Sequence, residues 1–168
     1  MSGSRQFLGK YRGKVTDIAD PSKIGRIKAQ VPDVTGSGAT GWAMPCVPFG
    51  GASMGFFALP KVGAGVWIEF ERGDPDYPIW TGCWFGAEGD LPSDFKAELG
   101  KVVMIQTEGG SKITIDDRSD TKGIILETSG GQKIKLNKDG IEIDNGKGAK
   151  IKLDSSTVKV NDGSLEVM

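Results

Sequence analysis

Apolar and polar residues alternate with a period of two along the last third of the chain. In short segments between Lys112 and Val167, Ile, Leu or Val occupies every second position, with Lys, Glu or Thr between them. Successive side chains of a β-strand point to opposite faces of the sheet, so this pattern predicts strands with one dry and one wet face. The expected dry residues are Ile113, Ile115, Ile134, Leu136, Ile141, Ile143, Ile151, Leu153, Val158, Val160, Leu165 and Val167. The expected wet residues are Lys135, Glu142, Lys152, Lys159 and Glu166.

The same region contains an internal repeat. Gly110–Asp116 matches Gly131–Asn137 and Gly148–Asp154, with offsets of 21 and 17 residues. Such repetition is typical of a solenoid or β-helix. About six aliphatic side chains per repeat, at roughly 2 kcal/mol each, hardly offset the ordering of about 17 residues at 1–2 kcal/mol each. This estimate favours several chains that share one core, but it also permits a single-chain solenoid.

The first half of the chain has short apolar segments separated by turn residues. One segment places Ile27, Ala29 and Val31 on one face, and Asp20–Lys23 is a turn signal. This spacing predicts a small closed barrel, with aromatic residues inside it or at its ends; an aromatic ligand platform is the alternative. The expected strands are Tyr11–Ile18, Arg26–Val31, Trp42–Val47, Phe56–Leu59, Gly65–Phe70 and Ile79–Phe85.

Composition divides the chain near residue 95. All 13 aromatic residues and all eight prolines precede Lys96. A narrow, aliphatic-only interior explains why rings are missing from the second half. We therefore expect a barrel at 1–88 with a short N-terminal extension, a linker at 89–100 with one helical turn at Ser93–Leu99, and a β-spike at 101–168.

The chain offers little catalytic chemistry. It has no histidine, which removes the usual general base and the commonest transition-metal ligand. Acidic pairs such as Asp116 and Asp117 are best explained as solvated turn residues, and Cys46 and Cys83 as buried free thiols. Turns such as Asp144–Gly146 leave calcium binding as a weak alternative. We therefore expect no enzymatic activity, no catalytic residues, no metal and no cofactor.

Two other function classes remain open. A small barrel with Arg12, Lys14, Arg26 and Lys28 near aromatic residues has the ingredients of an OB-fold that binds single-stranded nucleic acid or polysaccharide. The first 99 residues carry 10 basic and 11 acidic groups, so the basic groove that this function needs is not indicated. A cell-wall hydrolase is the third class, and its facing carboxylates are not evident either.

The first half resembles the OB-fold domain of the phage baseplate spike and VgrG family. The resemblance rests on Gly13–Asp17, Asp20–Pro32, Trp42–Pro45, Leu59–Gly63, Val66–Phe70 and Gly73–Gly82. The segments D-P-x-x-x-G-R and G-D-x-x-x-P-x-x-x-G are specific in combination. The second half is similar to the β-helical stalk of the same family, where Gly110–Asp117 and Gly131–Leu136 match the start of the stalk.

This resemblance implies an all-β chain with an N-terminal OB-fold barrel and a C-terminal intertwined trimeric β-helix. It also implies the structural central spike of a contractile injection machine, either a phage tail, a type VI-like system or an extracellular injection system. The barrel would anchor to a separate baseplate hub protein, and the needle would pierce the target envelope with transient membrane contact. No lysozyme insertion or nucleic-acid partner is expected.

The ends of the chain give two further expectations. Leu165, Glu166, Val167 and Met168 form an apolar end that a separate PAAR-type tip protein would cap. The N-terminal residues lack the apolar core of a signal peptide. We therefore expect synthesis in the bacterial cytoplasm and assembly into the baseplate of a virion or injection particle.

Overall fold

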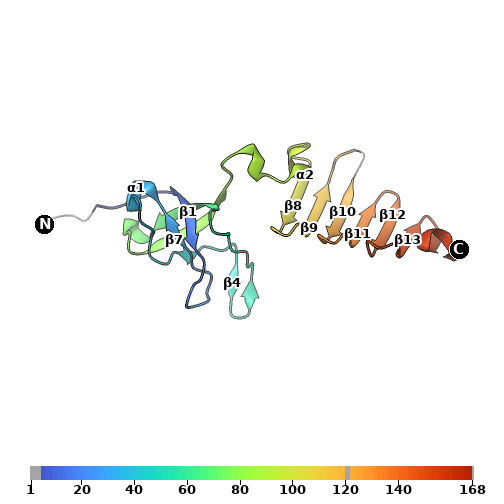
Figure 1. Cartoon of the computed structure of the whole chain (residues 1–168), viewed down its shortest axis with the longest axis horizontal. Coiled ribbons are helices and arrows are strands. Elements are labelled where there is room, and N and C mark those ends of the chain that lie inside the picture. Colours follow the sequence, from blue (N-terminus) through green and yellow to red (C-terminus); the bar gives the residue numbers. More distant parts are fainter. Residues whose placement is uncertain (1–4, 120–121, 168) are drawn as a thin grey trace. The chain divides into compact units, whose positions relative to one another are not determined.

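The chain folds into two compact units, Met1–Gly86 and Ala87–Met168. The computed structural model describes residues 5–119 and 122–167. Figure 1 shows the strands of both units. None of the helices in the described ranges is both long and apolar enough to cross a membrane.

A five-stranded sheet forms the first unit, in the order β2-β1-β6-β7-β3. The pairs are antiparallel except for β3 and β7, which run parallel. Its strands are β1 (Tyr11–Asp17), β2 (Lys28–Gln30), β3 (Met44–Pro45), β6 (Gly65–Phe70) and β7 (Pro78–Trp84). β1, β6 and β7 agree with the expected strands to within one residue at each end.

One backbone bridge joins the two edges of this sheet. Ile27 precedes β2 and Ala43 precedes β3, and their backbone groups exchange N–H···O bonds of 3.2 and 2.7 Å. The interior is filled by the alternating residues, since Ile27, Ala29 and Val31 are all fully buried as predicted. The rest of this core is Val15, Ala43, Val66, Ile68, Phe70 and Trp80.

Some expectations for the first unit are wrong. Phe56–Leu59 forms no strand; a hairpin of β4 (Gly50–Gly51) and β5 (Met54–Gly55) precedes it. The aromatic run resembles a buried strand, but Phe57 is 81% exposed and finds no neighbouring strand to pair with. Cys46 and Cys83 are free, as expected, but both are exposed rather than buried.

Short helices occupy the connections. α1 begins with a proline, one residue after the end of β2. Proline suits the first turn of a helix because the backbone N–H groups of that turn have no partner within the helix. The short helices are α1 (Pro32–Thr35), η1 (Glu71–Gly73), η2 (Glu88–Asp90), α2 (Ser93–Lys96) and η3 (Asn161–Gly163). α2 confirms the helical turn expected in the linker.

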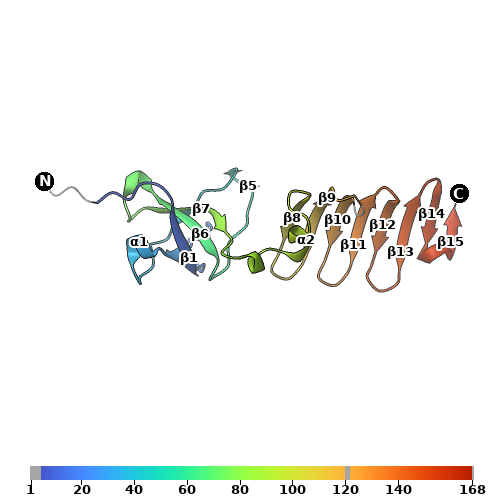
Figure 2. The same ribbon diagram turned by 90° about the horizontal axis from the view of Figure 1, so that it is seen from above.

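The second unit is an eight-stranded antiparallel sheet in which every strand pairs with its neighbours in sequence. Figure 2 shows these strands side by side in chain order. The strands are β8 (Val102–Gln106), β9 (Lys112–Asp116), β10 (Gly123–Glu127), β11 (Lys133–Asn137), β12 (Gly140–Asp144), β13 (Lys150–Asp154), β14 (Thr157–Val160) and β15 (Leu165–Val167). The period-two prediction of strands is therefore confirmed.

Ion pairs fix the start of this sheet. Asp116 is 2% exposed and accepts hydrogen bonds from the Arg118 guanidinium at 2.6–3.1 Å, so its assignment as a solvated turn acid is wrong. The guanidinium covers the carboxylate and satisfies it where water cannot reach. Lys112 on β9 lies 2.6 Å from Asp94 on α2, which ties the helical turn to the sheet.

Candidate functional site

The candidate functional site is the apolar face of the C-terminal sheet. Strand register aligns its residues into two continuous rows, because each apolar residue pairs with an apolar residue on the next strand. The first row is Ile105, Ile113, Leu126, Ile134, Ile143, Ile151, Val160 and Leu165. The second row is Val103, Ile115, Ile124, Leu136, Ile141, Leu153 and Val158, with Val167 next in register.

All ten residues expected in the β-helix core lie in these rows, but a single chain does not bury them. Nine of the ten are 37–46% exposed, and Val160 is half-buried. The first row also lines a hollow bordered by Ile113, Leu126 and Ile134. Monomeric proteins rarely expose a continuous apolar surface of this extent. The face therefore needs a partner surface of matching chemistry.

Four residues of the rows were missed by the sequence analysis. They are Val103, Ile105, Ile124 and Leu126. In Val102–Ile105 and Ile124–Leu126 apolar residues occupy both parities, so alternation cannot assign a face. On the other parity Val102 is 3% exposed, and Met104 and Ile125 are half-buried.

The opposite face of the sheet is charged. Its expected wet residues Lys135, Glu142, Lys152 and Lys159 stand in register along the centre of the face. A lateral row alternates in sign: Lys112, Glu127, Lys133, Asp144 and Lys150. Lys112 lies 3.4 Å from Glu127. This face is suited to water, and it leaves the apolar face as the surface for assembly.

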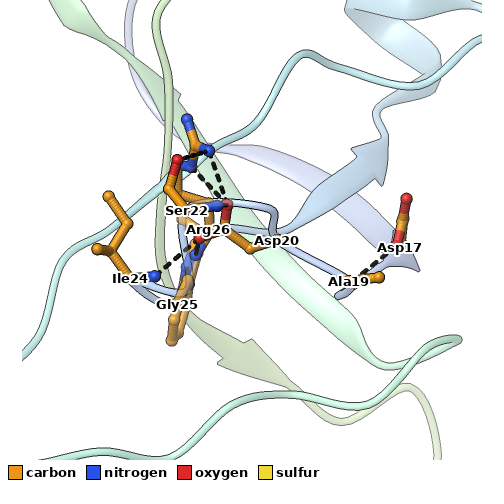
Figure 3. Close-up of polar contacts among 8 residues, drawn as sticks. Asp17, Ala19, Asp20, Ser22, Ile24, Gly25 and Arg26 are labelled. Atoms are coloured by element: carbon orange, nitrogen blue, oxygen red, sulfur yellow. Dashed lines mark hydrogen bonds and ion pairs between the residues drawn. The ribbon is translucent and has the colours of Figure 1, made fainter.

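The D-P-x-x-x-G-R segment forms a buried polar turn in the first unit (Figure 3). The Asp20 carboxylate accepts backbone N–H bonds from Ser22, Ile24 and Arg26 at 2.9–3.2 Å. The Arg26 guanidinium donates two more, at 2.9 and 2.7 Å. The hydrogen bond from Arg26 lowers the pKa of Asp20 far below its usual value, and the backbone donors add to this effect. Both charges are satisfied within the turn, which indicates a structural role.

Tryptophan rings of the first unit lie against the chain's own cations. The Arg12 guanidinium lies 5.5 Å from the ring centre of Trp67 and 5.3 Å from that of Trp84. Lys28 lies 4.8 Å from the ring of Trp42. These rings thus already carry the cation–π contacts that a stacking base would compete with.

The C-terminal end of the sheet holds the residues expected to meet a tip protein. Leu165 is 59% exposed and begins β15, which pairs with β14 alone among the described strands. Met168 lies outside the described residues. No group of acidic or sulfur side chains within residues 5–119 and 122–167 is arranged to hold a metal ion.

Family comparison adds to this geometry. Residues 11–85 match the model of the type VI secretion system and phage-baseplate injector OB domain. Residues 101–166 match the phage baseplate V C-terminal trimerisation domain, which covers both apolar rows up to Leu165. The chain belongs to the phage baseplate and VgrG spike family. The resemblance stated from the motifs is thus confirmed, as are the all-β class, the OB domain and a C-terminal domain that forms homotrimers.

Relatives in the spike family are much longer. The actin cross-linking toxin VgrG1 of Vibrio cholerae is 32% identical over 89 residues, 51% of this chain and 8% of that protein. The type VI secretion system spike protein VgrG3 of Vibrio cholerae is 25% identical over 128 residues, which is 71% of this chain and 13% of that protein. The type VI secretion system spike protein VgrG5 of Pseudomonas aeruginosa is 31% identical over 90 residues, which is 51% of this chain and 11% of that protein. The chain thus matches only about a tenth of the length of these spike proteins.

Proposed function

We propose that this chain is the structural central spike of a contractile injection machine, with a mechanical role and no catalytic one. Three chains would wind their C-terminal sheets around one axis, with the two apolar rows inside and the charged faces outside. The observation that carries the proposal is the pair of rows that continues across all eight strands. Such rows have no use on the surface of a monomer.

Burial supports this assembly energetically. Fully burying an aliphatic side chain contributes about 1.5–3 kcal/mol, so completing the burial of one that is 37–46% exposed contributes about 1 kcal/mol. Eleven residues of the rows lie in this range, and Val103, Ile105 and Leu165 are 57–66% exposed. Together they give roughly 14 kcal/mol of apolar stabilisation per chain on assembly. The spike gains stiffness from this because no layer can leave the axis without exposing its neighbours.

We assign anchoring to the OB domain and piercing to the C-terminal end of the chain. The OB domain is the part that would bind a baseplate hub protein, since its buried polar turn and the backbone bridge between its sheet edges define its shape. The C-terminal end would enter the target envelope, with transient membrane contact. A PAAR-type tip protein would cap Leu165 and the strand that it begins, whose outer edge pairs with none of the described strands.

Solution mass tests the core of the proposal. The full chain should have three times its 17.8 kDa mass by light scattering, and it should resist dissociation by SDS at room temperature. A monomer at micromolar concentration would refute the spike. Lytic activity on purified peptidoglycan would refute the non-catalytic role.

Particle assays test the anchoring and piercing roles. A tagged chain should be recovered in contractile particles from the producing cell, and Leu136→Asn should abolish both recovery and target killing while Lys135→Asn preserves them. Removal of Leu165–Met168 should release a co-purifying tip protein without loss of the trimer. Retention of the tip protein after that deletion would contradict the proposed cap.

A further inference from the structure

The β4–β5 hairpin of the OB domain carries a second apolar surface, separate from the rows of the C-terminal sheet. Phe57 is 81% exposed, Met54 60% and Phe49 59%, and Phe56 and Leu59 are each 46% exposed. These five residues are called the hairpin patch below. At about 200 Å² for a fully exposed large side chain, they expose roughly 600 Å². That approaches the roughly 800 Å² which one partner contributes to a standard interface.

The composition of this segment is that of an interface core. Residues 34–60 contain no charged side chain, in a chain of which 26% is charged. Aromatic residues and Met are enriched, and charged residues depleted, at the buried centre of protein interfaces. A solvated loop gains nothing from such a composition, because charged residues keep exposed loops soluble.

The hairpin is also built to hold its aromatic residues in place. Phe56 donates its backbone N–H to Phe49 at 3.2 Å, which extends the pairing of β4 with β5. A Cβ atom at Gly55 would lie 3.2 Å from both the Gly50 Cα atom and the Phe49 carbonyl oxygen, so the two strands of the hairpin approach closely at this glycine. The patch is therefore presented on a defined backbone rather than on a free loop.

We propose that the hairpin patch docks onto the OB barrel of the next copy in the trimer. This inference rests on the proposed trimer. The trimerisation domain at 101–166 keeps three barrels tethered to one another. Tethering raises the effective concentration of the barrels to about the millimolar range, so a surface of roughly 600 Å² is large enough to close. Threefold symmetry requires head-to-tail contacts, in which two different surfaces of each copy meet. The hairpin supplies one surface, and the barrel of its neighbour supplies the other.

Site-specific photo-cross-linking tests this docking in the full-length chain. A benzophenone amino acid replaces Phe57 in one variant and Tyr77, which is 60% exposed, in a matched control. We expect irradiation to produce interchain products from position 57 that map to barrel residues of another copy, and none from position 77. Products that are absent at 57, or equal at both positions, overturn the proposal.

A second variant gives an independent readout. Phe57→Ser should lower the melting midpoint of the barrel by about 5–10 °C in the trimer, whereas Tyr77→Ser should leave it unchanged. An unchanged melting midpoint for Phe57→Ser overturns the docking. The docking is also overturned if, in the presence of lipid vesicles, position 57 cross-links to lipid and gives no interchain product. The mass of each variant is measured first. A trimeric mass with no cross-link defeats only this inference, whereas a monomeric mass defeats the proposed function as well.

Discussion

Replacing Leu136 with Asn is the most direct test of the apolar face. Leu136 lies in the middle of its row and is 37% exposed in a single chain. Covering that remaining third contributes about 0.5–1 kcal/mol, and a buried amide without partners costs about 1–3 kcal/mol. The substitution should therefore cost about 2–4 kcal/mol per chain and about 6–12 kcal/mol per trimer. Since about 1.4 kcal/mol corresponds to a tenfold change in an equilibrium constant, the association constant of the trimer should fall by about four to eight orders of magnitude.

The matched control is Lys135→Asn, one residue earlier on the same strand and on the charged face. Both variants receive the same side chain in β11, so differences in β-propensity and local backbone effects are shared. Light scattering over a dilution series and thermal denaturation measure the outcome. We expect Leu136→Asn to dissociate at micromolar concentration while Lys135→Asn remains a trimer within a few degrees of the parent midpoint.

The reasoning fails if the two variants behave alike. Equal trimer stability would mean that the apolar face is not the shared interior. A trimer lost in Lys135→Asn but kept in Leu136→Asn would mean that the charged face points inward. Either result would remove the basis for an apolar core around the axis.

Three further predictions follow from the two units. Asp20→Asn should lower the melting midpoint of the barrel at pH 7, because the carboxylate accepts five hydrogen bonds. Since the pKa of Asp20 is lowered from 3.8, the difference in melting midpoint between the variant and the parent should shrink as the pH falls below 3.8. A difference in midpoint that does not change with pH would contradict this. Gly140→Ala should destabilise the spike by about 2–4 kcal/mol per chain in thermal or chemical denaturation, because a Cβ there would lie 1.9 Å from the Leu153 carbonyl oxygen, whereas Gly109→Ala meets open space and should be near neutral. Trp80→Phe removes the 3.1 Å hydrogen bond from the indole N–H to the Gly25 carbonyl oxygen and should cost about 1–3 kcal/mol in chemical denaturation; no change would contradict a role for that bond.

The sequence predicted the spike strands well because one rule governs most of them. Where apolar residues occupy one parity, as in Lys133–Asn137, the face of each residue follows directly from the alternation. The rule failed at β8 and β10, where Val102 is buried and Ile125 is half-buried in a second layer on the other face, near the start of the sheet. That layer depends on residues distant in sequence, which a local pattern does not contain.

The barrel was predicted less completely. β6 was assigned correctly because Gly65–Phe70 alternates and is bounded by glycine and a turn. The hairpin was missed because Phe56 and Phe57 suggest a buried strand, whereas their side chains are 46% and 81% exposed in the single chain. Asp20 could be recognised as part of a motif, but its five hydrogen bonds depend on the positive φ angles of Lys23 and Gly25, which let the turn close around the carboxylate.

In the proposed spike, the alternating charges on the charged face have a consequence for passage through an envelope. Neighbouring strands lie about 4.8 Å apart, so opposite charges in the row from Lys112 to Lys150 follow one another within less than the Debye length of about 8 Å. Their fields cancel a short distance from the surface. Anionic headgroups and basic proteins therefore experience almost no net attraction along the flank, and little electrostatic drag opposes its movement past either.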